Sequence, residues 1–278
     1  MGTGPLQIAL AWRSIFIADL SKGALMEPGI VYTAETVAKD RITRRGEAEC
    51  FEVVRTTFYA EPMSATDIYL TGTSTPLTAT KNDVLIFARE GIGRLVVGDE
   101  QVDLSRGTAA MIKSGETFHY QDGHGLKLLE VHVPDSSGPH GRRLAAPTGT
   151  FVRSVQQGIS SKGNATGNRE FEVLYDAQRG SSGATMFIGF IPTSGAPAHF
   201  HLYDEICQII SGGGKLETHD KVQPISSGST FVVAPRMLHS LVNDRDEDLW
   251  VLGIFRPQGT PAAAYYPDGT PAPGYTEV

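Results

Sequence analysis

Equivalent residues recur at a fixed offset along this chain. Moving the sequence along itself by 121 residues, without gaps, places residues 78–114 on residues 199–235. The identical pairs are Asp83 with Asp204, Gly91 with Gly212, Gly93 with Gly214, Leu95 with Leu216, Asp99 with Asp220, Ser105 with Ser226 and Gly107 with Gly228. Most of them are glycines or aspartates, which β-structures use where turns need special backbone angles. An internal repeat of this kind indicates two copies of one β-rich domain.

Composition agrees with two β domains. The chain has 278 residues, enough for two domains that each bury a core, and its 31 Gly and 16 Pro fall in clusters between short apolar runs. Strands are predicted at residues 83–88, 205–210, 230–234 and 249–255. We therefore predict an all-β chain with few short helices, divided into residues 1–147 and 148–278.

The second copy carries a candidate metal site. His199 and His201 are two residues apart, Glu205 follows four residues later, and His239 lies further along the chain. Alternate residues of a strand face the same side, so His199 and His201 are expected to point together. Imidazoles with one carboxylate suit iron, manganese, nickel or cobalt, with zinc also possible. The pattern predicts a divalent transition-metal site.

The same residues carry a family resemblance. His199, His201, Glu205 and His239, with Gly212, Gly228, Pro235 and Asn243, closely resemble the two sequence motifs of the cupin superfamily. Two departures, an early Gly195 and a stretch from Pro235 to His239 that is one residue short, touch no ligand. The resemblance implies two tandem jelly-roll barrels, a bicupin similar to quercetinase-like dioxygenases. It also implies that the three His and Glu205 bind the metal, and that the chain forms a homodimer.

The first copy lacks most of this pattern. Thr78, Thr80 and Val84 fall where the second copy has His199, His201 and Glu205, and only His119, at an offset of 120, falls on a ligand position. One imidazole cannot hold a divalent ion in a defined geometry, so we predict a metal-free first barrel that is structural or provides a surface for dimerisation or substrate access. The alternative is a small-molecule pocket formed by Thr78, Thr80 and His119.

Three functions fit the predicted site. The preferred one is a metal-dependent dioxygenase acting on a small enolisable or aromatic substrate, with dioxygen as co-substrate. The second is a non-oxidative isomerase, cyclase, decarboxylase or lyase, and the third is a bicupin that binds a small molecule or metal without turnover. In the enzymes, Glu205 is also predicted to be the general base.

Residues near the ligands are open to more than one role. Tyr203, Gln208 and Arg236 could orient a substrate, although packing roles are expected more often. Asp204 is expected to serve a turn because Asp83 matches it in the copy without a metal site. The Pro- and Tyr-rich residues 256–275 could close over a barrel mouth or pack along its outside.

Several classes of function are excluded at this stage. The formal net charge of -7 argues against binding nucleic acid. The chain has no run of 18 apolar residues, so no transmembrane helix is expected. Residues 5–20 are expected to form a packing arm rather than an export signal. With only Cys50 and Cys207, no disulfide framework is expected, and the cytoplasm fits. Cys207 could point its sulfur into the site, but a buried apolar role is favoured.

Overall fold

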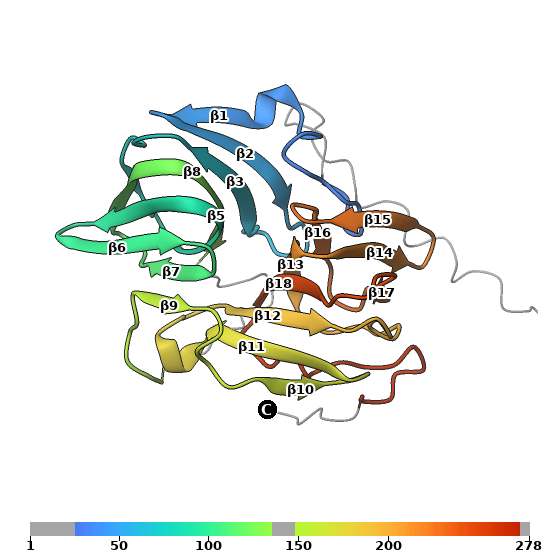
Figure 1. Ribbon diagram of the computed structural model, residues 1–278. Coiled ribbons are helices and arrows are strands. Elements are labelled where there is room, and N and C mark those ends of the chain that lie inside the picture. Colours follow the sequence, from blue (N-terminus) through green and yellow to red (C-terminus); the bar gives the residue numbers. More distant parts are fainter. Residues whose placement is uncertain (1–25, 135–147, 273–278) are drawn as a thin grey trace, which may run out of the picture.

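A computed structural model describes residues 26–134 and 148–272, and in these ranges the chain is built almost wholly of strands (Figure 1). The described helices are two short 3-10 turns, η1 (Lys39–Arg41) and η2 (Ala177–Arg179). No helix in the described ranges has the length and apolar character needed to cross a membrane. The all-β prediction is confirmed, whereas the arm predicted at residues 5–20 lies outside the described residues.

The first barrel is a single sheet that curls on itself. It contains β1 (Ile42–Arg45), β2 (Ala48–Arg55), β3 (Ser64–Leu70), β4 (Leu77–Thr78), β5 (Asn82–Val97), β6 (Glu100–Ser105), β7 (Thr108–Ile112) and β8 (Thr117–Pro134). The order is β1-β2-β3-β8-β5-β7-β9, where β9 is Ser154–Gln156 from the second half of the chain, with β4 on β8 and β6 on β5. Register shifts interrupt the long pairing of β5 with β8, and Gly91 lies among them with a φ of 70°. A Cβ there would lie 2.2 Å from Gly125 O, so the bend requires glycine.

The second barrel repeats this plan with the long strands broken. Its strands are β10 (Gly163–Ala165), β11 (Arg169–Tyr175), β12 (Thr185–Ile191), β13 (Asp204–Ser211), β14 (Gly213–Thr218), β15 (Val222–Ser226), β16 (Thr230–Val233), β17 (His239–Val242) and β18 (Leu249–Arg256). One sheet has the order β10-β11-β12-β18-β13-β16, and a second has β15-β14-β17. β13 and β14 together correspond to β5, and Gly212 between them, with a φ of 77°, matches Gly91.

Each barrel receives an edge segment from the other half of the chain. β9 (Ser154–Gln156) pairs with β7 of the first barrel, with Val155 opposite Ala109. In the same way Tyr32 bridges Thr230 of β16 in the second barrel. Strand pairing therefore crosses the boundary predicted between residues 147 and 148 in both directions, and the division at that boundary stays a prediction (Figure 1).

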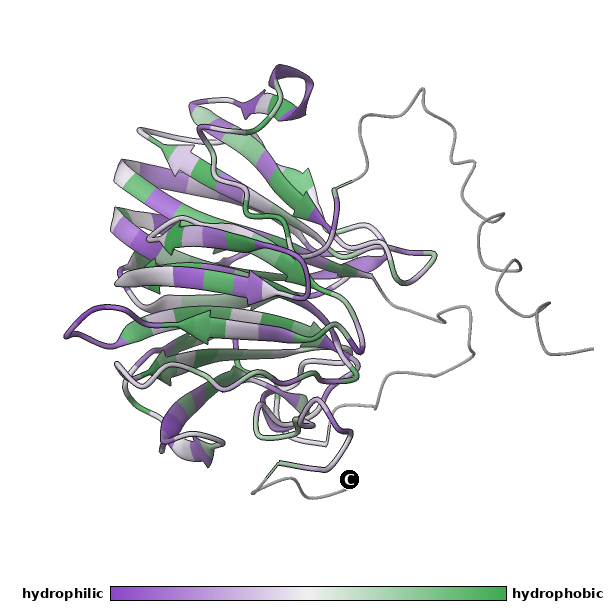
Figure 2. Ribbon diagram, turned by 90° about the vertical axis from the view of Figure 1, so that its right-hand side faces the viewer, coloured by the Kyte–Doolittle hydropathy of each residue, from purple (hydrophilic) through white to green (hydrophobic). Residues whose placement is uncertain are grey.

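Buried side chains form three clusters, in keeping with the hydrophobic and hydrophilic residues that alternate along the strands (Figure 2). One fills the first barrel and another the second. The largest draws on both halves of the chain, for example Val131 of β8 and Ile254 of β18, and lies between the barrels. Burying the outer faces of two sheets against each other fixes the barrels as one body.

Polar side chains also cross between the barrels. Asp67 of β3 accepts hydrogen bonds from Arg89 at 2.9 Å and from Gln208 of β13 at 3.0 Å. Asp204, expected to serve a turn, is fully buried and forms an ion pair with Arg256 at 3.5 Å. Arg256 also donates to the backbone oxygen of Glu61 in the first half. Gln208 is therefore an inter-barrel residue rather than a pocket residue.

Candidate metal centre

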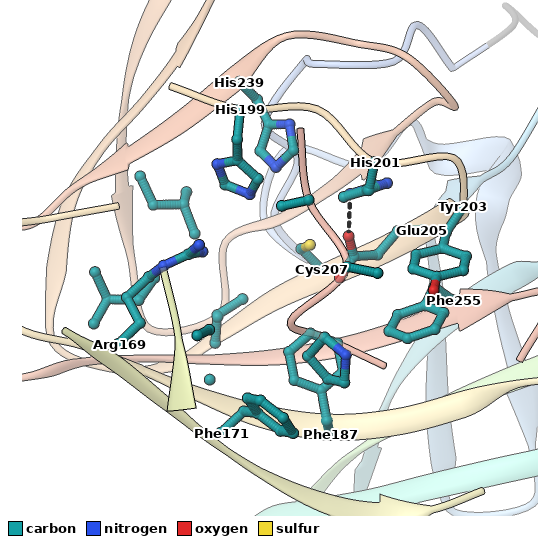
Figure 3. Close-up of a pocket in the computed structure, with 18 of the residues that line it drawn as sticks. Arg169, Phe171, Phe187, His199, His201, Tyr203, Glu205, Cys207, His239 and Phe255 are labelled. Atoms are coloured by element: carbon teal, nitrogen blue, oxygen red, sulfur yellow. Dashed lines mark ion pairs between the residues drawn. The ribbon is translucent and has the colours of Figure 1, made fainter. Parts of the chain in front are cut away.

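The four predicted ligands line one pocket inside the second barrel (Figure 3). His199 and His201 lie just before β13, Glu205 is on β13, and His239 begins β17. All four are buried, each with 6% of its surface exposed. The structure therefore brings the residues of both sequence motifs to a single cavity.

A backbone bridge joins the two motifs. His199 N donates to His239 O and His239 N donates to His199 O, both at 3.0 Å. The ring centroids of these residues are 4.4 Å apart, and those of His201 and His239 are 5.1 Å apart. Because a hydrogen-bonded pair of residues places both side chains on the same face, the bridge explains why residues 40 positions apart meet.

Two of the imidazoles are held as one tautomer. His199 Nδ1 lies 2.7 Å from Pro197 O, and His239 Nδ1 lies 3.0 Å from Met237 O. A carbonyl oxygen can only accept, so each Nδ1 carries the proton and each Nε2 keeps a free lone pair. Burial lowers the pKa of His239 to about 4 and that of His199 well below its usual value, so both rings are neutral at pH 7. This is the state in which imidazole binds a metal.

His201 and Glu205 contact each other directly. His201 Nε2 lies 2.6 Å from Glu205 Oε2, yet neither ring nitrogen of His201 makes a hydrogen bond of good geometry. Burial opposes ionisation of Glu205, but the electrostatic interaction and contact with His201 outweigh it and hold the pKa of the carboxyl below its usual value. A buried imidazole without hydrogen bonds, beside a carboxylate, has the donor chemistry of a metal site.

The donors are close but not gathered around one point. Among residues 26–134 and 148–272, no group of three or more His, Cys, Asp or Glu side chains already has the arrangement that holds an ion. Binding an ion here therefore requires the side chains to move, because His201 and Glu205 now contact each other. The assignment of His199, His201, Glu205 and His239 as ligands stays a prediction.

Glu205 is positioned by two residues deeper in the barrel. Cys207, two residues along β13, lines the pocket and hydrogen-bonds to Glu205, and burial raises the pKa of its thiol well above the usual value. Gly253 of β18 leaves room for the carboxylate, since a Cβ there would lie 2.6 Å from Glu205 Oε1. Cys207 is thus a protonated, buried thiol, and Cys50 and Cys207 are both free.

The other walls are mostly apolar, with one cation. Arg169, at the start of β11, enters the cavity on the side opposite Tyr203 and Phe255 (Figure 3). The sequence analysis missed this arginine because nothing in its local sequence marks it as a pocket residue. Apolar side chains line much of the rest of the cavity: Phe171, Phe187, Ile191, Phe231, Leu241, Val251 and Phe255.

The chain after β18 closes one side of the pocket. Pro261, Ala263 and Ala264 line the cavity. Tyr265 pairs with Phe200 through backbone hydrogen bonds of 2.9 and 2.8 Å, and the two rings stack with centroids 5.2 Å apart. The described part of the tail therefore covers the barrel mouth, the first of the two roles predicted for it.

Tyr203 and Arg236, both candidates for orienting a substrate, lie in different places relative to the pocket. Tyr203 lines the pocket with its ring stacked on Phe255, the centroids being 4.1 Å apart. Arg236 adopts a φ of 66° in the loop before β17 and is not among the pocket walls. Tyr203 therefore belongs to the site and Arg236 to its supporting loop.

The first barrel has no comparable arrangement. Thr78 and Thr80 are exposed, whereas Ala79 between them is buried, and the hydroxyl of Thr78 bonds to that of Thr117 at 2.8 Å. The ungapped offset of 121 therefore does not preserve side-chain direction here. His119 is half-buried, between the buried Phe118 and Tyr120. The pocket proposed for Thr78, Thr80 and His119 is wrong, since these side chains do not enclose one.

A largely buried ion pair lies among the apolar side chains inside the first barrel. Tyr120 donates to Glu130 at 2.7 Å, and Arg45 forms an ion pair with the same carboxylate at 2.7 Å. Glu130 is 2% exposed, and despite burial its charged partners lower its pKa to about 2. A satisfied internal ion pair supports the structural role predicted for this barrel.

The fold has known counterparts. A family model described as the AraC-like ligand binding domain matches residues 191–272. No curated protein matches the sequence. Among solved structures, a Lactobacillus farciminis oxalate decarboxylase in complex with formate is 13% identical with a TM-score of 0.64, over 85% of this chain and 88% of that one.

Two further structures agree. AerE from Microcystis aeruginosa is 11% identical with a TM-score of 0.61, over 81% of this chain and 98% of that one. A cupin 2 conserved barrel domain protein from Leptotrichia buccalis is 12% identical with a TM-score of 0.56, over 83% and 98% of the two chains. These similarities, with the repeated strand order, confirm the resemblance noted in the sequence: the chain has the cupin fold, built twice in tandem.

Proposed function

We propose that the second barrel binds one divalent transition-metal ion and that the chain is a metal-dependent enzyme acting on a small organic substrate. The observation that carries the proposal is the set of donors in one cavity: three imidazoles and one carboxylate, two of the imidazoles held as Nδ1–H tautomers by backbone carbonyls. Iron, manganese, nickel and cobalt suit these donors, and zinc is possible.

Each residue of the site has a role. His199, His201, Glu205 and His239 would hold the ion, which supplies Lewis-acid polarisation of a substrate oxygen when bound. Glu205 also takes a proton from the substrate, because its low pKa keeps it ionised and Cys207 and Gly253 fix its position. The aromatic walls exclude water from the reacting atoms and strengthen electrostatic contacts inside the cavity.

The preferred chemistry is that of a dioxygenase with an enolisable or aromatic substrate. Phe171, Phe187 and Phe255 offer flat apolar surfaces next to the candidate ligands, which fit such a substrate better than a fully polar one. A non-oxidative decarboxylase is the second candidate, favoured by the similarity of the fold to oxalate decarboxylases and by the presence of Arg169 in the cavity.

Metal analysis and oxygen uptake test the proposal. Elemental analysis of the purified protein should find near-stoichiometric iron, manganese, nickel or cobalt, lost when His199 and His201 are both changed to Ala. His219→Ala is the matched control, because His219 is an exposed histidine of the same barrel. Oxygen consumption with small enolisable or phenolic substrates would support the dioxygenase. Turnover without oxygen consumption, or zinc alone, would favour the non-oxidative enzyme.

A protein without metal, even after reconstitution with each of these ions, would contradict the proposal. The double barrel would then be a ligand-binding module, in keeping with the family model that matches residues 191–272.

A further inference from the structure

Arg169 enters the pocket of the candidate metal ligands from a tight hairpin, which contacts Pro197 just before His199. The turn between β10 and β11 has positive φ angles of 77° at Gly167 and 59° at Asn168, directly before Arg169. A Cβ on Gly167 would lie 2.8 Å from Pro197 Cδ, so the hairpin packs against the residue whose carbonyl fixes His199. The arginine is therefore held at a defined place relative to the candidate ligands.

Arg169 is half-buried, and no carboxylate of the described residues forms an ion pair with its guanidinium. Its Nε donates to Thr166 O at 2.6 Å, but Nη2 is buried and makes no hydrogen bond. Burial lowers the pKa of Arg169 to about 10, which still leaves it fully charged at pH 7. A buried donor of a charged group that makes no hydrogen bond is costly unless something else completes its contacts.

The carboxylates of the pocket already have other partners. Glu170, the next residue, forms an ion pair with Lys162 at 2.8 Å, and Glu205 contacts His201 at 2.6 Å. Neither forms an ion pair with Arg169, although the charge of Glu205 offsets part of the effect of burial on the pKa of Arg169. An anionic group on a molecule in the cavity would supply the ion pair that the described residues leave unmade and would accept from the unused Nη2 donor.

We propose that Arg169 binds the carboxylate of the substrate, so that the enzyme acts on a small carboxylic acid with an apolar or aromatic body. The guanidinium fork matches a carboxylate, which it can bind through two hydrogen bonds. A single cation among Phe171, Ile191 and Leu241 suits a monoanion better than a phosphate, which needs more donors. The inference rests on the proposed function and adds the substrate class to it.

The proposed carboxylate-binding residue and the candidate metal ligands occupy different parts of the pocket. Arg169 lies on the side of the cavity opposite Tyr203 and Phe255, with His199 and Glu205 between (Figure 3). A carboxylate held there leaves the rest of the molecule directed toward the candidate metal ligands and the general base. Arg169 is thus a specificity-determining residue.

Calorimetric binding of phenylacetate and of its neutral amide, phenylacetamide, tests the inference. The wild-type protein, with the metal it is purified with, should bind the acid at least about tenfold more tightly than the amide, since charge-assisted hydrogen bonds contribute roughly 1.5–3 kcal/mol. Arg169→Gln should remove this preference without lowering metal content. Arg169→Lys should restore part of it, because the charge returns without the fork. Arg106→Gln, at an exposed arginine of the first barrel, should leave it unchanged.

Several results would overturn the inference. They are equal affinities of the wild type for acid and amide, no binding of the acid at millimolar concentration, or a preference that survives Arg169→Gln. Loss of metal in both Arg169→Gln and Arg169→Lys would also overturn it, by making Arg169 a support for the metal site.

The same titrations after removal of metal with a chelator distinguish this inference from the proposal of a metal-dependent enzyme. A metal-free wild type that keeps its preference supports the role of Arg169 even where the metal proposal fails.

Discussion

Glu205 Oε2 lies 2.6 Å from His201 Nε2, so two of the four candidate ligands hold each other within the pocket. Without an ion, the carboxylate of Glu205 and the buried imidazole of His201 each have the other as an electrostatic partner, a role that a bound ion would take over. It also explains why the ligand set is assembled in one cavity without its donor atoms converging on one point. Metal binding should therefore separate this pair.

Glu205→Gln tests the role of the carboxylate in catalysis. We expect turnover, on a substrate found by the oxygen-uptake screen, to fall by about 10²–10⁴-fold at full metal occupancy, because an amide cannot accept the substrate proton. Steady-state rates normalised to bound metal measure the effect. Glu217→Gln, on β14 outside the pocket, is the control. Unchanged turnover of the loaded Gln variant would rule out Glu205 as the base.

Cys207→Ala should leave the metal in place. The thiol is buried, has a raised pKa and acts as a hydrogen-bond partner of Glu205, so we expect unchanged metal stoichiometry by elemental analysis. Turnover should fall modestly because Glu205 loses one contact. A variant that is purified without metal would instead make Cys207 a ligand.

Acidification should destabilise the metal-free protein through His239. Its pKa is about 4 in the folded chain and 6.5 in the unfolded chain, so the unfolded state binds the proton first. The stability that this group contributes is present above pH 6.5 and lost between pH 6.5 and 4, at most about 3 kcal/mol. Urea unfolding of chelator-treated protein at pH 7 and pH 5 measures it.

His239→Gln should show a smaller loss of stability over the same pH range, since one of the buried imidazoles that resist protonation is gone. His199, whose pKa is also lowered, accounts for the part that remains. Equal losses in wild type and variant would show that His239 titrates normally in the folded protein.

Asp67→Ala should strongly destabilise the contact between the barrels. It leaves Arg89 buried without its carboxylate at 2.9 Å and removes the acceptor of Gln208, which we expect to cost about 3–5 kcal/mol of unfolding free energy. Asp103→Ala breaks an exposed ion pair with Arg94 and should change stability by less than about 1 kcal/mol. Chemical denaturation compares the two, and similar midpoints would contradict the prediction. Adding Arg89→Met to Asp67→Ala should recover part of the loss.

Arg169→Met should leave thermal stability unchanged or raise it. Nη2 of the guanidinium is buried without a hydrogen bond, so an apolar side chain of similar length removes a desolvation penalty and loses one hydrogen bond, to Thr166. Arg153→Met is the contrast, because Arg153 bonds to Glu116 at 2.7 Å and to Glu100 at 2.9 Å, and it should lower the melting temperature. A melting temperature that falls as far in Arg169→Met would show that Arg169 is satisfied in the folded state.

The local sequence was sufficient to predict the fold class and the candidate ligands. Turn glycines such as Gly91 and Gly212 recur because the same sharp bend is needed in each barrel, and the bend leaves its trace in the residue type. His199 and His201 were predicted to point together because strand alternation is a local property, and both lie in the cavity. The resemblance to cupins rests on these same positions.

Side-chain direction and partnership were decided by tertiary structure alone. Thr78 and Thr80 match His199 and His201 in an ungapped comparison, yet they face outward, because a shift of one residue moves every side chain of a strand to its other face. Gln208 and Asp204 became inter-barrel residues because one face of each sheet packs on the other barrel, which a single sequence does not record. The importance of Arg169 became visible only in the folded structure, where its Nη2 is buried without a hydrogen bond.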